Sequence, residues 1–416
     1  MRIYIETYGC SANLNNAEIL SGILLDNNHK LVNSEKEADI VIINTCIVKG
    51  PTENKIVRRI KDVKKPLIVT GCMADAEISA IKKANKKAIA LSSHRLSDVQ
   101  EVIERWASIL EKKHEVKVGL PKKNRSEVIE IIQINEGCLN NCAYCITKLA
   151  KGDLFSYPED LIVEQVKKSK AKEIWITSQD CAAYGLDIGT NLPNLLRKIS
   201  NINRDFKVRI GMANPHLIKR FLPELIEVLK DKHFFKFLHI PVQAGNDEVL
   251  KNMKRGYKAK VFSDIVEQVR KEIPGITIWT DIICGFPGET SEQFEDSLTL
   301  IEETKPDSIH INRFWPRRGT PAAKMKQIPV KEVQERTKRM MALFRKMAAE
   351  KNKFFVGNEY SVLVDEFDGK DYLARTDNYK LVKLKSKKNI LGEKLKISIT
   401  KAETHSLIGE IISSQT

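Results

Sequence analysis

Three cysteines stand close together in the chain, as Cys138, Cys142 and Cys145 in a C-x3-C-x2-C pattern. Thiolates at this spacing can reach three corners of one cubane iron–sulfur cluster. The fourth iron then has no local protein ligand and can chelate the amino and carboxylate groups of S-adenosylmethionine (SAM). Zinc is the alternative metal, but zinc prefers four closed ligands, and no fourth Cys or His lies nearby. The motif therefore predicts an open iron–sulfur cluster, held just after a strand expected at 129–134.

A second set of three cysteines is spread over the first part of the chain. Each of them follows a short apolar segment that is typical of a strand: Cys10 after 2–6, Cys46 after 39–44 and Cys72 after 67–70. Carboxyl ends of parallel strands meet at one edge of an open α/β sheet, where such sheets bind their ligands. Three cysteines again leave one iron open, so we expect a second cluster here. The alternative is that they are buried structural cysteines, a common environment for this residue.

Composition excludes several classes of protein. The 416 residues include 69 Lys and Arg against 54 Asp and Glu, a formal charge of +15 that favours a polyanionic partner. No apolar run approaches the roughly 18 residues that span a bilayer, and the N-terminus lacks the apolar segment of a signal peptide. We therefore expect a cytoplasmic protein with no membrane partner, whose cysteines do not form disulfides. Cys181 and Cys284 match neither set and are expected to pack at a barrel rim.

The pattern of apolar segments predicts an α/β protein of three domains. Residues 1–111 alternate strands with helices, which indicates an open parallel α/β sheet, and the polar, basic stretch 112–127 is expected to be a linker. Six strand–helix units follow in 128–353, fewer than a closed TIM barrel contains, so we expect an open, partial (β/α)6 TIM-like barrel. Residues 354–416 carry about five short strand-like runs, typical of a small OB-like β-barrel.

Four further motifs complete the pattern: LHIPVQAG at 238–245, MKRGY at 253–257, DIICGFPGET at 281–290 and PRRGTPAAKM at 316–325. Together with the two cysteine sets, they resemble the methylthiotransferase family of radical-SAM enzymes. Segments 147–158 and 173–180 are similar to the archaeal and eukaryotic branch of that family. This branch modifies N6-threonylcarbamoyladenosine at position 37 of tRNA, beside the anticodon.

The resemblance covers essentially the whole chain and implies an N-terminal cluster domain, a radical-SAM core and a C-terminal, RNA-binding TRAM domain. It implies two [4Fe-4S] clusters and SAM as cofactors, with a methylthio group inserted at C2 of the modified adenosine. One SAM would donate the methyl group, and a second would give the radical that removes hydrogen from C2. A low-potential electron donor and a sulfur source are further implied partners, and we expect a monomer. Because a carbon radical cannot travel, the N-terminal domain should cap the mouth of the barrel.

Side chains at the ends of the barrel strands are the expected SAM contacts. They are Tyr144 before the last motif cysteine, Ser178 and Gln179 after the second strand, Arg209 in the third strand and Gln243 after the fourth. The alternative for each is ordinary hydrogen bonding at a strand end. His239 lies within a strand and is expected to be a core or rim histidine rather than a ligand.

Basic residues concentrate in the helix expected at 331–353 and in the terminal domain. Seven lysines gather there with Glu393 as the only acid among them: Lys380, Lys383, Lys385, Lys387, Lys388, Lys394 and Lys396. On a small barrel they are typical of a phosphate-binding face, here for the tRNA anticodon stem-loop. A merely solvated surface is the alternative.

Other functions remain open at the level of the sequence. The same chemistry could act on isopentenyladenosine in tRNA or on an aspartate of a ribosomal protein. A non-catalytic RNA-binding protein could keep its clusters as structural or redox-sensing groups, and a generic radical-SAM enzyme could hold one cluster only. The basic terminal domain favours RNA, and the segment 150–152 favours the threonylcarbamoyl branch.

Overall fold

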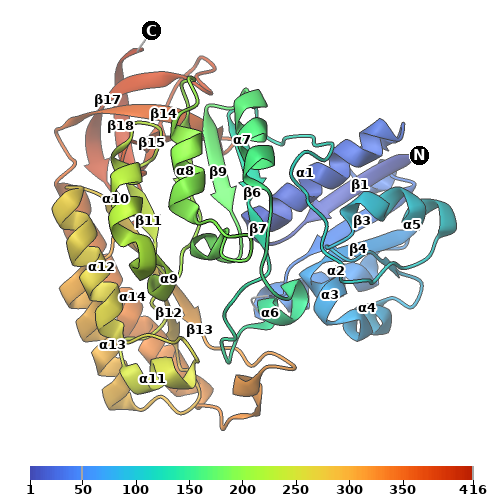
Figure 1. The fold of residues 1–416 in the computed structure, drawn as a ribbon, viewed down its shortest axis with the longest axis horizontal. Coiled ribbons are helices and arrows are strands. Elements are labelled where there is room, and N and C mark those ends of the chain that lie inside the picture. The colour runs from blue at the N-terminus through green and yellow to red at the C-terminus, as the bar shows by residue number, and fades with distance from the viewer. Residues whose placement is uncertain (48–49, 415–416) are drawn as a thin grey trace.

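The computed structural model describes residues 1–47 and 50–414, which form an N-terminal α/β domain, a central core and a small C-terminal barrel (Figure 1). The expected α/β class is confirmed, and so are the three predicted architectures. Within these residues, no helix is both long enough and apolar enough to cross a membrane.

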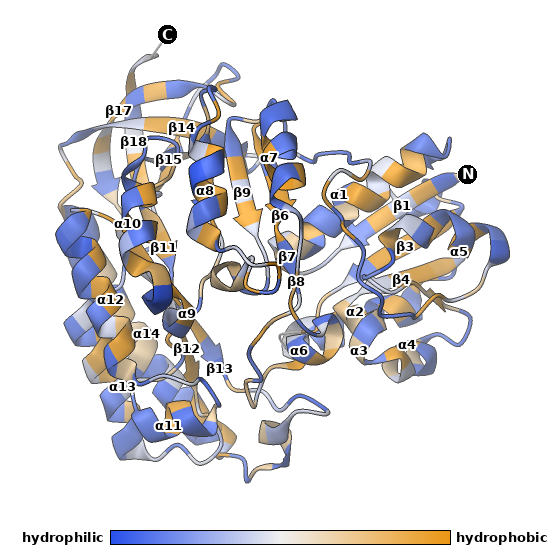
Figure 2. Ribbon diagram, in the orientation of Figure 1, coloured by the Kyte–Doolittle hydropathy of each residue, from blue (hydrophilic) through white to orange (hydrophobic). Residues whose placement is uncertain are grey.

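A five-stranded parallel sheet forms the N-terminal domain, in the order β2-β1-β3-β4-β5. The strands are β1 (Arg2–Thr7), β2 (Lys30–Leu31), β3 (Ile40–Thr45), β4 (Leu67–Gly71) and β5 (Ile89–Ala90). The helices are α1 (Ser11–Asp26), α2 (Gly50–Asp62), α3 (Cys72–Ala76), α4 (Ile78–Ala84) and α5 (Val99–Arg105). The central strands are buried on both faces, as their nearly continuous apolar sequences require (Figure 2).

The last helix of this domain is shorter than the sequence predicts. The apolar periodicity predicts a helix over 96–111, but this helix ends as α5 at Arg105, because Trp106 adopts a left-handed conformation with φ of 48°. Ile109 then pairs beside Leu91, and this bridge extends the sheet past β5. The apolar periodicity of 96–111 therefore reflects two separate segments that pack on one sheet.

Six parallel strands form the core in two groups, β10-β9-β6 and β11-β12-β13, linked by a bridge between Val208 and Phe234. The strands are β6 (Ile129–Gln133), β9 (Glu173–Thr177), β10 (Lys207–Ile210), β11 (Phe237–His239), β12 (Thr277–Cys284) and β13 (Ser308–Arg313). The helices are α7 (Glu159–Lys168), α8 (Leu192–Ser200), α9 (Pro215–Ile218), α10 (Leu222–Lys230), α12 (Ala259–Glu272), α13 (Ser291–Thr304) and α14 (Val330–Lys353). Shorter elements are β7 (Asn135–Glu136), α6 (Ile146–Lys151), β8 (Phe155–Ser156) and α11 (Asp247–Asn252). The barrel is open, with β6 and β13 as its outer strands.

The C-terminal domain is a closed barrel with the strand order β14-β15-β16-β18-β17. Its strands are β14 (Glu359–Phe367), β15 (Tyr372–Thr376), β16 (Leu381–Leu384), β17 (Lys394–Ala402) and β18 (Leu407–Ser414). The barrel stands at the amino ends of the core strands (Figure 1). There Tyr379 packs against Phe235, Phe237 and Trp279, and the nitrogen of Lys236 donates to the carbonyl of Asp377 at 2.8 Å. One end of the core is thus closed by packing, which leaves the carboxyl ends of its strands for a site.

The N-terminal domain covers the open edge of the core. Leu14 of α1 packs in one apolar cluster with Ile129 and Ile131 of β6. The hydroxyls of Ser11 and Thr177 are 2.6 Å apart, so the start of α1 also meets the carboxyl end of β9. An uncovered edge strand is a liability in a sheet, and here a helix of the neighbouring domain removes it.

The predicted linker packs against both neighbouring domains over part of its length. Val118 belongs to the core cluster, and Lys117 is buried. Lys122 forms an ion pair with Glu18 of α1 at 3.1 Å. Polar residues of the linker therefore form ion pairs with both neighbouring domains. The composition of the linker alone does not reveal these partners.

Gly22 tests this packing, because a Cβ there would stand 2.3 Å from backbone atoms of both Pro121 and Lys122. We expect Gly22→Ala to destabilise the protein by about 1–3 kcal/mol, as other overpacked sites do, and to speed protease cleavage within 112–127. Ser21→Ala is the control, since it removes a hydroxyl that bonds its own helix. Thermal unfolding and limited proteolysis measure both effects, and a Gly22→Ala protein that behaves like Ser21→Ala would contradict a packed linker.

Candidate active site

The first cysteine set converges at the carboxyl edge of the N-terminal sheet. Cys10 caps α1 directly after β1, Cys46 follows β3, and Cys72 is the first residue of α3 after β4. Burial raises the pKa of the Cys72 thiol, and the neighbouring Cys10 and Cys46 raise it further. A buried thiol beside two others ionises readily only with a compensating cation nearby, which is the environment that a metal cluster provides.

Two glycines allow the cysteine loops to approach one another. Gly9 has φ of +120°, and a Cβ on it would stand 2.9 Å from the Cβ of Cys46. Gly71 has φ of +87°, and its Cβ would stand 2.4 Å from the carbonyl oxygen of Thr45. Both positions therefore need glycine for conformation and for space.

Two buried asparagines, which the sequence analysis did not single out, brace the same loops. The amide of Asn13 donates to the carbonyls of Tyr8 at 2.8 Å and Thr45 at 2.9 Å. The amide of Asn44 donates to the carbonyl of Asn13 at 2.7 Å. These bonds tie the loops of Cys10 and Cys46 together, and the family-like spacing of the cysteines alone gave no sign of them.

The second cysteine set lies in the loop between β7 and α6, and Cys145 caps that helix. Burial raises the pKa of Cys138 to about 11, with a smaller contribution from Asp180. The guanidinium of Arg255 donates to the sulfur of Cys142 at 3.3 Å and to the carbonyl of Pro241 at 3.0 Å. Arg255 belongs to the MKRGY motif, but its place beside a cysteine sulfur emerges only from the structure.

A cavity of about 740 Å³ opens beside this loop. Its lining includes Tyr144 and Cys145 of the cysteine loop, Gln243 and Asp281 of the core, and Gly50 of the N-terminal domain. The two domains therefore share one cavity, as the capping of the barrel mouth requires. Its size suits a nucleoside or SAM, which bind in concave sites of this scale.

Only two of the five expected SAM contacts line this cavity in the described structure. Tyr144 and Gln243 line the cavity. Gln179 accepts a hydrogen bond from the nitrogen of Gly137 at 2.9 Å and so holds the start of the cysteine loop. Ser178 accepts from the nitrogen of Asp180 at 3.1 Å and orders the turn after β9.

Arg209 does not fit the expected role of a SAM contact. Its guanidinium lies over the rings of Trp175, Phe237 and Tyr379 at 5.1, 5.6 and 5.7 Å. Tyr379 comes from the C-terminal barrel, so Arg209 packs at the end of the core that this barrel closes. We expected Arg209 to contact SAM because it lies in a barrel strand. Its position in the strand does not reveal toward which end of the core its side chain extends.

His239 is a rim histidine, as expected, with Asp281 as its partner. Its Nε2 lies 2.5 Å from a carboxylate oxygen of Asp281, and the Nδ1 of His310 lies 3.4 Å from the other oxygen. Burial alone would raise the pKa of Asp281, but the bonds with both histidines lower it well below its usual range. Cys181 and Cys284 are fully buried in the core cluster, which confirms their expected packing role.

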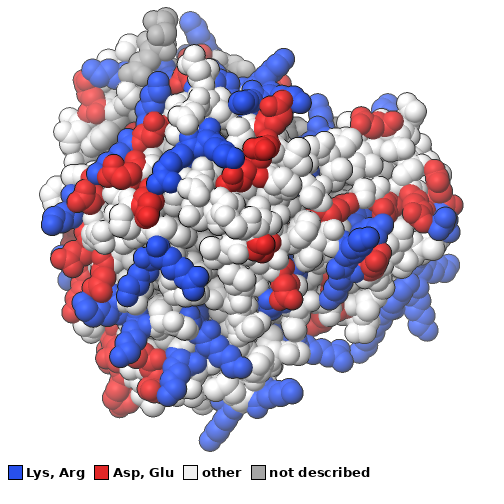
Figure 3. All heavy atoms as spheres, in the orientation of Figure 1, with Lys and Arg blue, Asp and Glu red and all other residues white. Residues whose placement is uncertain are grey.

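Four of the seven lysines of the expected phosphate-binding face are engaged in ion pairs. Lys380 is the clearest departure, because its ammonium lies 3.1 Å from half-buried Asp307 at the junction with the core. The others pair on the surface: Lys383 with Glu403, Lys394 with Asp205 and Lys396 with Glu359. Basic side chains also dominate the lower edge of the N-terminal domain near α4 (Figure 3). The positive charge is therefore spread more widely than the sequence pattern indicates.

Gly71 provides a test of the first cysteine set. Gly71→Ala should cut bound iron from about eight to about four per chain, because its new Cβ displaces the Thr45 backbone beside Cys72. Gly369→Ala is the matched control, since Gly369 has φ of +93° with nothing within 4 Å of its Cβ. Iron analysis after anaerobic reconstitution gives the answer, and a full complement of iron in Gly71→Ala would refute the role of this loop.

Comparison with known proteins matches each domain separately. Residues 2–92 match the model described as Uncharacterized protein family UPF0004, residues 132–301 the Radical SAM superfamily and residues 353–412 the TRAM domain. Among solved structures, a cobalamin-bound radical SAM methyltransferase from Kitasatospora setae has a TM-score of 0.55 and 14% identity over 77% of each chain. This likeness concerns the fold alone.

Curated relatives match the chain along its whole length. The probable threonylcarbamoyladenosine tRNA methylthiotransferase of Methanocaldococcus jannaschii is 40% identical over 99% of this chain and 97% of its own. That of Pyrococcus horikoshii is 38% identical over 99% of this chain and 100% of its own. The human threonylcarbamoyladenosine tRNA methylthiotransferase is 37% identical over 99% of this chain and 74% of its own. The chain therefore belongs to the family of threonylcarbamoyladenosine tRNA methylthiotransferases.

Proposed function

We propose that this chain is a radical-SAM enzyme that methylthiolates C2 of N6-threonylcarbamoyladenosine at position 37 of tRNA. The observation that carries the proposal is the shared cavity, lined by Cys145 of the core and Gly50 of the N-terminal domain. A reaction that joins two cluster sites on one substrate carbon needs such a junction. The two [4Fe-4S] clusters and SAM are the cofactors of this chemistry.

The six cysteines would hold the clusters, three for each. When bound, the clusters and SAM supply the radical that removes hydrogen from C2 and the sulfur that replaces it. Arg255 would hold Cys142 in place through its hydrogen bond, and Gln179 would fix Gly137 ahead of the cysteine loop. Tyr144 and Gln243 would contact SAM or the modified base from the cavity wall.

The segment 314–325 after β13 closes the cavity toward the N-terminal domain. Arg317 forms an ion pair with Glu53 of α2, and the nitrogen of Ala322 donates to the carbonyl of Ala143 at 2.9 Å. Both cysteine-bearing domains are thus fixed by one segment of the core. This arrangement would shield a reactive carbon radical from solvent and from the reactants dissolved in it.

The substrate is tRNA, and its binding would depend on the lysines that remain uncommitted. In the described part of the chain, Lys385, Lys387 and Lys388 have no ion pair, unlike the other four lysines of their group. We assign these three to phosphate contacts with the anticodon stem-loop. We further propose that the enzyme acts as a monomer in the cytoplasm. It would use a low-potential electron donor and a sulfur source as partners.

Analysis of tRNA nucleosides tests the function and its nearest alternatives together. In a deletion strain, mass spectrometry should find threonylcarbamoyladenosine without its 2-methylthio derivative, and the intact gene should restore that derivative. A Cys145→Ser gene is the control, because it removes one cysteine of the core set while leaving the chain otherwise complete. Loss of methylthio-isopentenyladenosine instead would establish the isopentenyl alternative, and unchanged tRNA would leave a protein substrate.

Formation of 5′-deoxyadenosine separates the enzyme from a non-catalytic RNA-binding protein. The reconstituted chain should release this product from SAM after reduction, and Cys145→Ser should not. If the reconstituted chain holds about eight irons and yields none of the product, the non-catalytic alternative is correct.

The three free lysines give a separate prediction about tRNA binding. Replacing Lys385, Lys387 and Lys388 with Ala should weaken binding of the anticodon stem-loop and reduce its salt dependence by roughly three phosphate contacts. The double variant Lys394→Ala/Lys396→Ala is the control, because these lysines already pair with Asp205 and Glu359. Affinity titrations at several salt concentrations measure the slope, and equal slopes in both variants would oppose the assignment.

A further inference from the structure

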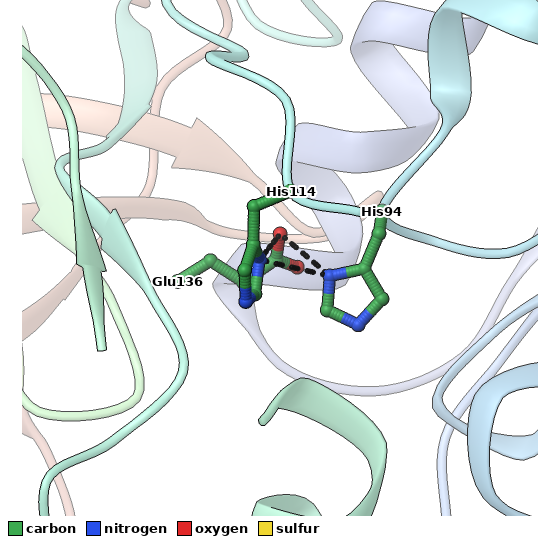
Figure 4. A group of neighbouring side chains, drawn as sticks. All are labelled: His94, His114 and Glu136. Atoms are coloured by element: carbon green, nitrogen blue, oxygen red, sulfur yellow. Dashed lines mark hydrogen bonds and ion pairs between the residues drawn. The ribbon is translucent and has the colours of Figure 1, made fainter. Parts of the chain in front are cut away.

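A buried charged network lies between the N-terminal domain and the core. The carboxylate of Glu136 in β7 is fully buried and accepts from the ammonium of Lys117 at 2.9 Å and of Lys151 at 2.7 Å. The Nδ1 atoms of His94 and His114 lie 3.3 and 3.5 Å from its other oxygen (Figure 4). His94 belongs to the N-terminal domain, His114 and Lys117 to the linker, and Lys151 to the end of α6.

The three side chains in Figure 4 have the composition of a metal site, but their surroundings argue against one. Two ammonium groups already occupy the carboxylate of Glu136. The Nε2 of His94 donates to the carbonyl of Ala150 at 2.9 Å, and its Nδ1 lies 3.0 Å from the Nδ1 of His114. A divalent cation would add charge to a buried group that already holds two cations. We therefore treat the group as a charge network.

Lys151 connects this network to the first cysteine set. Its ammonium bonds the hydroxyl of Ser93, and the nitrogen of Ser93 donates to Asp75 at 3.0 Å. Asp75 belongs to α3, the helix that begins at Cys72. Ala150, the neighbour of Lys151, packs in one apolar cluster with Cys72. The cation of the core domain thus stands beside a cysteine of the other domain.

Of the two lysines on Glu136, Lys151 is the one linked to the cysteine set. Its ammonium bonds Ser93, and both the nitrogen and the hydroxyl of Ser93 donate to Asp75 of α3. Helix α6, which carries Lys151, packs against α3, the helix that begins at Cys72. In the described chain, the ammonium of Lys117 bonds Glu136 alone. Lys151 is therefore the cation of the network that lies toward the cysteine set.

We propose that Lys151 is a positioning residue of the core that stabilises the reduced form of the N-terminal cluster held by Cys10, Cys46 and Cys72. This inference rests on the clusters of the proposed function. Reduction adds negative charge to a cluster, and a fixed cation nearby favours it, so the reduction potential rises. Glu136 opposes this effect by its own charge while it holds Lys151 in place. Helix α6 would then serve both clusters, because Cys145 caps one end and Lys151 ends the other.

The reduction potential of each cluster tests the inference without tRNA or turnover. In the full-length, reconstituted protein, Lys151→Met should lower the potential of the N-terminal cluster in a redox titration followed by electron paramagnetic resonance. Glu136→Gln should raise it, and the double variant should lie between the two. The radical-SAM cluster should change less in every variant. Opposite signs distinguish a charge effect from a loss of structure, which would shift both variants in the same direction.

Lys117→Met is the matched control. Lys117 is a buried lysine on the same carboxylate, and in the described chain its ammonium bonds Glu136 alone. Its replacement should shift the potential of the N-terminal cluster less than Lys151→Met does. Equal shifts for the two lysines, shifts of one sign for Lys151→Met and Glu136→Gln, or no shift would overturn the inference.

Iron content separates failure of the inference from failure of the proposed function. About eight irons in wild type and variants mean that the potentials report on the proposal. About four irons in the wild type would instead refute the N-terminal cluster on which the proposed function depends. If Lys151→Met loses half of its iron, Lys151→Arg decides: this variant keeps the charge and should keep the wild-type potential. A lowered potential in Lys151→Arg would overturn the inference.

Discussion

The open edge of the core barrel is the constraint on which the rest of the structure depends. Six parallel strands do not close a barrel, so β6 needs a partner for its exposed side. Helix α1 of the N-terminal domain provides it, and the residue that caps α1 is Cys10. The contact that completes the core therefore also brings the first cysteine set toward the second. The interface that covers the open edge of the barrel is thus also the one that carries Cys10.

Buried charged groups add to the apolar packing that holds that interface together. Glu136, Lys117 and Lys151 are buried between the domains, and each polar group finds partners from another segment. Breaking one member of such a network leaves an uncompensated buried charge, which is strongly destabilising. The network therefore restricts the domains to one relative placement. A reaction in which a carbon radical must meet a sulfur from another domain requires that restriction.

The sequence was informative wherever chemistry fixes spacing. The two cysteine sets, the partial barrel and the five-stranded terminal barrel follow from patterns that need no knowledge of the remaining side chains. Arg209 and Lys380 were misjudged because their partners, Tyr379 and Asp307, lie far away in the sequence. Asn13 and Asn44 gave no signal, since buried amides that brace loops have no characteristic spacing.

The linker is a second case in which the sequence does not reveal a long-range partner. A polar, basic stretch has the composition of a solvated loop, yet Lys117 in it is buried against Glu136. Burial of a lysine depends on a carboxylate in the folded neighbour, and that carboxylate cannot be identified before the fold is known. The partners of buried charged residues can thus be identified only once the structure is known.

Our central proposal is that each cysteine set holds one cluster and that the two clusters lie close together at the junction of the two domains. Magnetic coupling between the clusters tests it most directly, in electron paramagnetic resonance spectra of the reconstituted protein with both clusters reduced. We predict spectra broadened or split by the interaction, which return to a single uncoupled signal when Cys10, Cys46 and Cys72 are all replaced by Ala. A spectrum equal to the sum of two independent clusters would contradict the account.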